Sequence, residues 1–337
     1  VLHPMQVFEY LPAFVGAWRT FQHRSGRNYI LFQTNDWLSG WVGLQLRNQL
    51  GLPLVHSSCV IGALKYLWLE TVQELSIRHS VERICLEQAD CVVATNPLEV
   101  VDLCQMMPNR GQVKVVPYGI DTQHFGSLSQ AIARQKLGIA PETRLILYVG
   151  RFAPLKGIEI LVKACALLPK PFQLYLVNNS GGEEGDWEEQ QYVRTLVKQM
   201  DVDASVVFIG QVSRSQLPSY YAAANVCVVP SYYEESGLIS LESMASGTPV
   251  IAHAVGGLRY VVRHGQTGLL VPPFNLNVLA TSIWDSLSNP ARWRTYGLIG
   301  QRWVRSRFSY AAVSTQMYDL YQSVSLAKGM EADQRHP

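Results

Sequence analysis

The chain has 337 residues, of which 48% are hydrophobic and 16% are charged, and its formal net charge is +2 at pH 7. This length suggests two domains, and the hydrophobic content is enough for folded cores, which excludes an intrinsically disordered chain. The small net charge gives no support for nucleic acid as a partner.

Short apolar runs alternate with longer amphipathic stretches along nearly the whole chain. Ten runs are predicted as strands, at residues 28–33, 52–56, 90–95, 113–117, 145–149, 173–177, 205–210, 225–230, 249–252 and 268–271. They are rich in Val, Ile and Leu and do not alternate with polar residues, which is typical of parallel sheets covered on both faces. Strands that alternate with helices predict an α/β fold with right-handed crossovers.

The alternation breaks once, between residues 118 and 144, where the sequence reads as a loop and a short helix. We place a domain boundary in this segment. It separates an N-terminal Rossmann-like domain at 1–125 from a second one at 126–308, followed by a last helix at 309–328. Ligands of such sheets bind outside the carboxyl ends of the strands, so the expected site is the cleft between two facing domains.

Two glutamates, Glu234 and Glu242, flank the predicted start of a helix at Gly237, Leu238 and Ile239. Free N–H groups and the positive end of the helix dipole favour a phosphate there, and a glycine lets a ligand approach the backbone closely. Carboxylates accept hydrogen bonds from vicinal hydroxyls. A phosphate with a sugar on each side, as in a nucleotide sugar, would therefore suit this stretch.

Two cations, Arg151 and Lys156, flank a loop after the first strand of the second domain, and Gly157 precedes the next helix. Such a pair can neutralise a diphosphate without a metal. The glycine pair Gly256 and Gly257 follows another strand end. Each of these features alone also has a plain structural explanation, as a solvated loop charge or a simple turn.

Together and in this order, the motifs resemble the retaining glycosyltransferases of the GT-B fold. They resemble the family 4 or group 1 type, which includes sucrose-phosphate synthases, glycogen synthases and mycothiol-pathway glycosyltransferases. The resemblance is carried by "GRFAPLKG", "PSYYEESGLISLESMASGTPVIA" and "GGLRYVVRHGQTGLLV". It implies two facing Rossmann-like domains, with a nucleotide-sugar donor bound mainly by the second.

The resemblance also implies roles for single residues. Glu234 would contact the donor sugar and Glu242 the ribose, while Arg151 and Lys156 would hold the diphosphate without a metal or cofactor. The expected catalytic residues are thus Glu234, Arg151 and Lys156. Arg78 lies in a more weakly matching segment and would bind an acceptor phosphate, although a surface charge on a helix is the other interpretation.

The first domain departs from the family pattern. "HSSCVIG" at 56–62 places Cys59 where the family usually has a histidine beside the donor sugar, and His56 is expected to be structural. We therefore expect this chain to bind a nucleotide better than it transfers a sugar. The family's opening strand and its Gly-rich loop are not visible, so the first domain is predicted to be incomplete at its start.

We expect an enzyme that moves a hexose from a nucleotide diphosphate sugar, with a UDP-sugar favoured over a GDP- or ADP-sugar. The expected acceptor is a small sugar phosphate or polyol phosphate, and the alternative is a lipid-linked glycan. A non-catalytic nucleotide-sugar-binding member and a same-fold epimerase are the competing interpretations. Asp201 and Asp203 form a D-x-D pair, but they precede a strand, at the wrong end of the sheet for the cleft, and no metal is expected.

The cysteines indicate the cellular compartment in which the protein is expected. Six are scattered through the sequence without CxxC pairs or metal-ligand spacing: Cys59, Cys85, Cys91, Cys104, Cys165 and Cys227. We interpret them as small hydrophobic residues in a reducing compartment. No signal peptide and no apolar run of 18 residues is apparent, so the sequence predicts a cytoplasmic protein without a transmembrane segment.

Overall fold

The computed structural model describes residues 4–57, 72–106, 112–179 and 186–333. The chain forms two units: Val1–Pro117 with Ser314–Pro337, and Tyr118–Val313. The division after Pro117 comes before the predicted boundary at residue 125, because Ile120 and Phe125 are buried in the core of the second unit.

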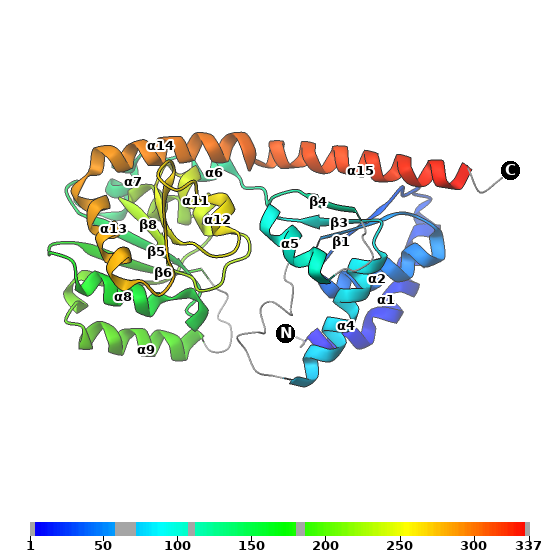
Figure 1. Cartoon of the computed structure of the whole chain (residues 1–337), viewed down its shortest axis with the longest axis horizontal. Helices are drawn as coiled ribbons and strands as arrows, with labels where there is room; N and C mark the ends of the chain where they lie inside the picture. Colours follow the sequence, from blue (N-terminus) through cyan, green and yellow to red (C-terminus); the bar gives the residue numbers. More distant parts are fainter. Residues whose placement is uncertain (1–3, 58–71, 107–111, 180–185, 334–337) are drawn as a thin grey trace. The chain divides into compact units, whose positions relative to one another are not determined.

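The first unit has a four-stranded sheet in the order β1-β2-β3-β4, and all of its strand pairs are parallel. Its described elements are α1 (Pro4–Ser25), β1 (Phe32–Asn35), α2 (Asp36–Leu50), β2 (Leu54–Ser57), α4 (Val72–Gln88), β3 (Cys91–Ala94), α5 (Pro97–Met106), β4 (Gln112–Val115) and most of α15 (Tyr310–Asp333). Buried side chains of α2, α4 and α5 pack on the sheet. Helix α1 lies along α2 (Figure 1), and its Leu11 and Val15 share a hydrophobic cluster with Val42 and Leu46 of α2.

The strand predicted at residues 28–33 is wrong in its position. β1 begins only at Phe32, which pairs with Leu54 of β2. Upstream of it, the Tyr29 ring lies 5.5 Å from the ring of Trp18 in α1, and Ile30 is 67% exposed. The apolar residues before Phe32 therefore belong to a connection that follows α1, outside the sheet.

The second unit has a six-stranded parallel sheet in the order β10-β9-β8-β5-β6-β7. Its strands are β5 (Leu145–Gly150), β6 (Gln173–Asn178), β7 (Val206–Gln211), β8 (Val226–Val229), β9 (Val250–His253) and β10 (Gly268–Val271). Its helices are α6 (Thr122–Phe125), α7 (Gln130–Leu137), η1 (Pro154–Lys156), α8 (Ile158–Ala166), α9 (Asp186–Gln199), η2 (Asp203–Ser205), α10 (Leu217–Ala223), α11 (Leu238–Ala245), α12 (Leu258–Val261), α13 (Leu276–Ser288) and α14 (Pro290–Arg307).

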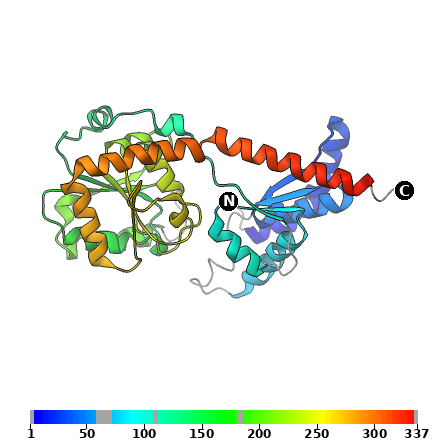
Figure 2. The same cartoon turned by 45° about the horizontal axis from the view of Figure 1, so that its top comes forward.

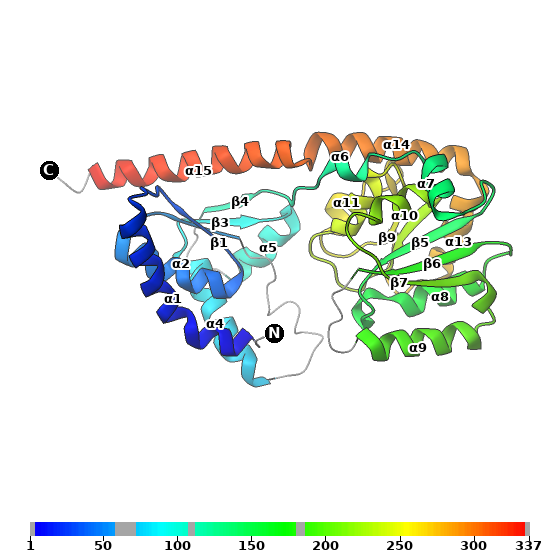
Figure 3. The same ribbon diagram turned by 180° about the vertical axis from the view of Figure 1, so that it is seen from behind.

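Helices lie on both faces of this sheet (Figures 1 and 3), and a hydrophobic core lies under each layer. Helices α8, α9 and α13 supply one core, α7, α10 and α11 supply the other, and α14 contributes to both. Every residue of β5, β8 and β9 is buried, as the non-alternating apolar runs predict for central parallel strands.

Helix α14 leads into α15 without an intervening strand (Figure 2). At this junction the N–H of Ile120 donates a hydrogen bond of 2.7 Å to the carbonyl oxygen of Phe308. In the part of the chain that the structure describes, no helix combines the length and the apolar character that a membrane span requires.

Candidate functional site

Three loops of the second unit meet at the carboxyl ends of β5, β8 and β9. The chain order of the sheet changes direction beside β5, because β6 lies on one side of it and β8 on the other. Open α/β sheets bind ligands at such a switch point. The loops that follow β5 and β8 carry the residues that the sequence predicts for a nucleotide sugar.

Lys156 and Glu234 meet across two of these loops. Lys156 ends the short helix η1 after β5, and Glu234 lies in the loop after β8. The Lys156 Nζ donates a hydrogen bond of 2.7 Å to Oε2 of Glu234, and their side chains are 30% and 10% exposed. A partly exposed lysine beside an almost buried carboxylate offers both charges to a polar ligand.

Contacts with Tyr148 and Asp186 hold Arg151 at the end of β5. The buried Tyr148 hydroxyl donates a hydrogen bond of 2.7 Å to the carbonyl oxygen of Arg151. The Arg151 Nη2 lies 3.3 Å from Oδ1 of Asp186, the first residue of α9. Because the Arg151 side chain is still 35% exposed, it can serve a ligand at this edge of the sheet.

Glycines let the loops approach each other at backbone distance. A Cβ on Gly157 would overlap with the carbonyl oxygen of Pro230, and the Tyr232 N–H donates to the carbonyl oxygen of Leu155 at 2.8 Å. Gly157 also has a positive φ of 64°, a conformation that side chains disfavour. The loop of Lys156 is therefore fixed against the loop of Glu234.

The glycine pair supports the Glu234 loop from the other side. Side chains on Gly256 and Gly257 would overlap with the carbonyl oxygens of Glu234 and Glu235. The Gly257 N–H donates a hydrogen bond of 2.9 Å to the Glu234 carbonyl oxygen. The pair is thus a support for the backbone of Glu234, a role that the sequence alone did not reveal.

Helix α11 starts beside Glu234, as the sequence predicts. Gly237 has a φ of 64° and precedes Leu238, whose N–H lies 3.4 Å from the Ser236 hydroxyl. The N–H groups of Leu238 and Ile239 belong to the first turn, where no carbonyl of the helix is available to them. They give this edge of the sheet the donors of an anion site.

Glu242 lies one turn further along α11 and is 6% exposed. The Tyr221 hydroxyl donates a hydrogen bond of 2.8 Å to its Oε2, and the Arg214 Nη1 lies 3.7 Å from its Oε1. Burial raises the pKa of Glu242, while Tyr221, Arg214 and His124 act in the opposite direction. Glu242 is therefore an almost buried carboxylate that can still be reached beside Arg214.

The acceptor-side residues lie in the first unit. Arg78 of α4 makes an ion pair of 2.6 Å with Glu82, and its Nη2 lies 4.0 Å from Oδ1 of Asp36, directly after β1. Arg78 is thus near the carboxyl end of a strand. Cys59 lies outside the described residues. His56 is buried, its Nδ1 lies 2.9 Å from the Thr34 hydroxyl, and burial lowers its pKa to about 4.

Asp186, Tyr221 and Arg214 were not predicted as part of the site. Each contacts a predicted residue from a different element of the chain. The sequence carries no periodic signal for such pairs. The D-x-D residues Asp201 and Asp203 precede β7, at the amino end of that strand. Within the described ranges, no group of three or more His, Cys, Asp or Glu side chains could hold a metal ion.

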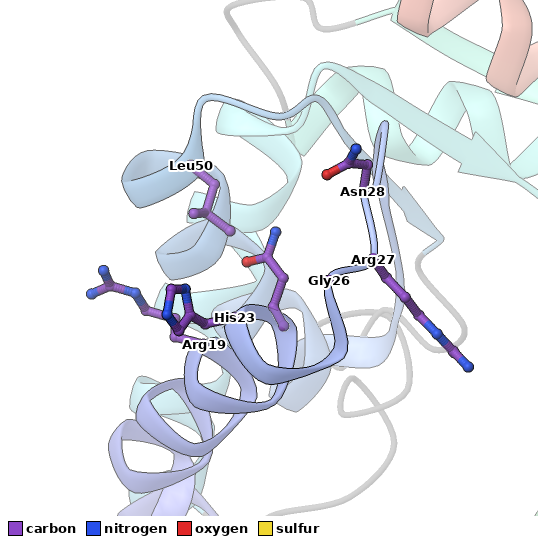
Figure 4. A pocket seen from close by; sticks show the side chains of 7 residues that line it. Arg19, His23, Gly26, Arg27, Asn28 and Leu50 are labelled. Atoms are coloured by element: carbon purple, nitrogen blue, oxygen red, sulfur yellow. The ribbon is translucent and has the colours of Figure 1, made fainter.

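A cavity of about 380 Å³ lies in the first unit (Figure 4). Arg19 and His23 of α1, Leu50 at the end of α2 and the connection from Gly26 to Asn28 contribute to its lining. These segments precede β1 and β2, so the cavity is at the amino ends of the strands, opposite the edge where parallel sheets bind ligands. It contains none of the predicted site residues.

Two protein families match the sequence. The family described as glycosyl transferases group 1 matches residues 129–300. The family described as glycosyl transferase 4-like domain matches residues 2–119.

Similar proteins span most of the chain. A D-inositol 3-phosphate glycosyltransferase of Corynebacterium efficiens is 33% identical over 334 residues, which are 94% of this chain and 77% of that protein. A D-inositol 3-phosphate glycosyltransferase 2 of Catenulispora acidiphila is 31% identical over 314 residues, with coverage of 91% and 73%.

Among solved structures, the sucrose-phosphate synthase of Thermosynechococcus elongatus superposes with a TM-score of 0.86 at 41% identity, covering 97% of this chain and 81% of that one. The Anabaena protein Alr3699/HepE, solved with UDP and glucose, has a TM-score of 0.78 at 23% identity, with coverage of 92% and 81%, and shares the fold.

Proposed function

This chain belongs to the group 1 glycosyltransferases, and we propose that it transfers a hexose from a nucleotide diphosphate sugar to a phosphorylated sugar or polyol, with retention of configuration. UDP-glucose is the proposed donor. One observation carries the proposal: Lys156, Glu234 and the start of α11 meet at the carboxyl edge of one sheet. Retention is inferred from the family resemblance.

In the proposed reaction, Arg151 and Lys156 stabilise the negative charge that builds up on the leaving diphosphate. The first N–H groups of α11 do the same from the other side. Glu234 accepts hydrogen bonds from the hydroxyls of the donor sugar and fixes its orientation. Lys156 exchanges its bond with Glu234 for a bond with the diphosphate, which needs only a rotation of its flexible side chain.

Arg78 supports a phosphorylated acceptor. Its side chain is 19% exposed, and its Nη2 lies 4.0 Å from Oδ1 of Asp36, near the carboxyl end of β1. Arginine is suited to phosphate because its planar donors match two phosphate oxygens. Two similar proteins support this acceptor class, since one is a D-inositol 3-phosphate glycosyltransferase and the other is a sucrose-phosphate synthase.

Calorimetry and product analysis test the proposal. The protein is titrated with UDP, GDP and ADP, and binding of UDP is expected to be the tightest. It is then incubated with UDP-glucose and, in separate reactions, with hexose phosphates, an inositol phosphate and a lipid-linked glycan. A glycosylated sugar or polyol phosphate with the anomeric configuration of the donor is expected. A folded protein that binds none of the three nucleotides would refute the proposal.

Removal of metal ions tests the role of the cations. Because Arg151, Lys156 and the start of α11 together supply positive charge, EDTA should leave both UDP affinity and transfer unchanged. A strict requirement for Mg²⁺ or Mn²⁺ would contradict the role assigned to the two side chains.

A further inference from the structure

Two groups contact the carboxylate of Glu242, one from the buried interior and one from an exposed loop. Tyr221, in α10, is fully buried and donates its hydroxyl hydrogen bond to Oε2 at 2.8 Å. Arg214, in the loop after β7, lies 3.7 Å from Oε1 and has a side chain that is 63% exposed. A buried donor therefore occupies one oxygen, and the other oxygen faces the side that a ligand can reach.

Tyr221 is itself fixed in place. The Thr248 hydroxyl donates a hydrogen bond of 2.6 Å to the Tyr221 carbonyl oxygen. The ring of Tyr221 packs against that of Phe125, with centroids 5.9 Å apart and planes at 70°. Burial and the neighbouring carboxylate of Glu242 raise the pKa of Tyr221, so the hydroxyl keeps its proton and remains a donor.

A carboxylate that binds vicinal hydroxyls must be ionised and correctly turned. Its two oxygens offer about four acceptor positions, and Tyr221 takes one of them. The remaining positions are enough for two hydroxyls. Burial alone favours the protonated form, which would replace an acceptor by a donor, whereas a hydrogen bond to the ionised form favours that form.

We propose that Tyr221 is a positioning residue of the nucleoside subsite, which fixes Oε2 of Glu242 so that Oε1 accepts hydrogen bonds from the ribose hydroxyls. This inference rests on the proposed function, in which Glu242 contacts the ribose of the donor. Tyr221 does not contact the nucleotide itself. Loss of its hydroxyl should therefore weaken the binding of ligands that carry a ribose, and it should leave the binding of ligands with only a diphosphate unchanged.

Calorimetry with two ligands separates this role from a purely structural one. Tyr221→Phe keeps the ring and removes one oxygen, and it should weaken UDP binding about tenfold, since hydrogen bonds to charged groups are among the stronger ones. Binding of inorganic pyrophosphate should stay unchanged. Tyr220→Phe removes a hydroxyl from the neighbouring position of α10 and is the matched control, for which both affinities should stay unchanged. An equal loss for UDP and pyrophosphate in Tyr221→Phe would mean that Tyr221 serves only the fold, and the inference would be wrong.

Glu242→Gln distinguishes failure of the inference from failure of the proposed function. The variant should weaken UDP binding and spare pyrophosphate, and the addition of Tyr221→Phe should then change UDP affinity by less than about twofold, because the two residues act as one unit. If Glu242→Gln leaves UDP affinity unchanged, the proposed contact with the ribose is wrong. If it weakens UDP while Tyr221→Phe alone does not, the contact stands and the positioning role of Tyr221 is refuted.

Discussion

At the scale of single residues, the ion pair between Lys156 and Glu234 is central to the proposed binding of the donor diphosphate. Lys156→Ala should weaken UDP binding by about 10-fold or more, because a hydrogen bond from a charged group contributes about 1.5–3 kcal/mol. The change also leaves the Glu234 carboxylate without the cation that lies 2.7 Å away. Calorimetric titration with UDP measures the effect.

A second lysine of the same unit provides the control. Lys163, in α8, makes a comparable contact of 2.9 Å with Glu159, one helical turn away. Lys163→Ala removes the same charge and the same kind of contact from a surface position. It should leave UDP affinity unchanged. Equal losses in the two variants would indicate a general effect of net charge, and no loss in either would remove Lys156 from the site.

The protonation of Glu242 should be visible in the pH dependence of UDP binding. Burial raises the pKa of this carboxyl above its ordinary value of 4.5. If the ionised form accepts the ribose hydroxyls, UDP affinity should rise as the pH increases through this raised pKa and then level off. Four groups that face the carboxylate, Tyr221, Arg214, His124 and Cys227, belong to other elements and remain in place when Glu242 is changed.

Glu242→Gln isolates this contribution, since an amide does not titrate. The ratio of UDP affinities in the original protein and the variant should grow with pH over the same interval. Changes that come from the diphosphate occur in both proteins and cancel in the ratio. A ratio that stays constant with pH would show that the charge of Glu242 is not used in binding.

At the scale of elements, the close contact of the loops makes Gly257 a support of the site. A Cβ there would overlap with the carbonyl oxygen of Glu235, so Gly257→Ala must displace the backbone beside Glu234. Overpacking of this kind costs about 1–3 kcal/mol of stability. We expect a lower free energy of unfolding and weaker UDP binding, measured by denaturant titration and calorimetry.

Gly265 is the matched control for this prediction. A Cβ at Gly265 would meet nothing within 4 Å, although its φ of 72° disfavours a side chain. Gly265→Ala should therefore cost about 1–2 kcal/mol of stability through backbone strain alone. UDP affinity should be retained. If Gly257→Ala also retained full UDP affinity, the glycine pair would not support Glu234.

All ten predicted strands have a counterpart in the structure, and their ends differ from the predicted ones by at most a few residues. The signal is strong because central parallel strands are buried on both faces and read as continuous apolar runs. The same signal misplaces β1, where Tyr29 and Ile30 look like strand residues but lie before it. Apolar composition shows that a segment can be buried, and packing decides which residues pair.

The site residues of the second unit could be predicted because they lie beside glycines, charged residues and strand ends in the sequence. Their contact partners could not be predicted. In the sequence, Asp186 lies 35 positions from Arg151. Tyr221 and Arg214 lie 21 and 28 positions from Glu242. Contacts of this range depend on how the elements pack, and one sequence does not specify them.

At the scale of the whole molecule, the GT-B fold predicted from the sequence is confirmed by two parallel-sheet units and the likeness to sucrose-phosphate synthase. The second unit contains two extensive cores of its own and every predicted donor residue. All the residues proposed to bind the donor therefore lie within one folded unit.

This organisation predicts that UDP stabilises the second unit against thermal unfolding and not the first. A ligand at 100 times its Kd stabilises the unit that binds it by about 2.7 kcal/mol. In thermal unfolding followed by calorimetry, UDP should raise the midpoint for the second unit and leave that of the first unchanged. The shift should largely disappear in Lys156→Ala. A shift of equal size for both units would mean that they unfold together.

The bond between Lys156 and Glu234 also bears on how a product leaves. In the proposed reaction, transfer of the hexose would leave Glu234 without a sugar to hold, and its carboxylate would again be available to Lys156, whose Nζ lies 2.7 Å from it. The remaining nucleotide diphosphate would then compete with Glu234 for the ammonium group of Lys156. Product release limits turnover in many enzymes. A side chain that first orients the donor would in this way also help to empty the site for the next cycle.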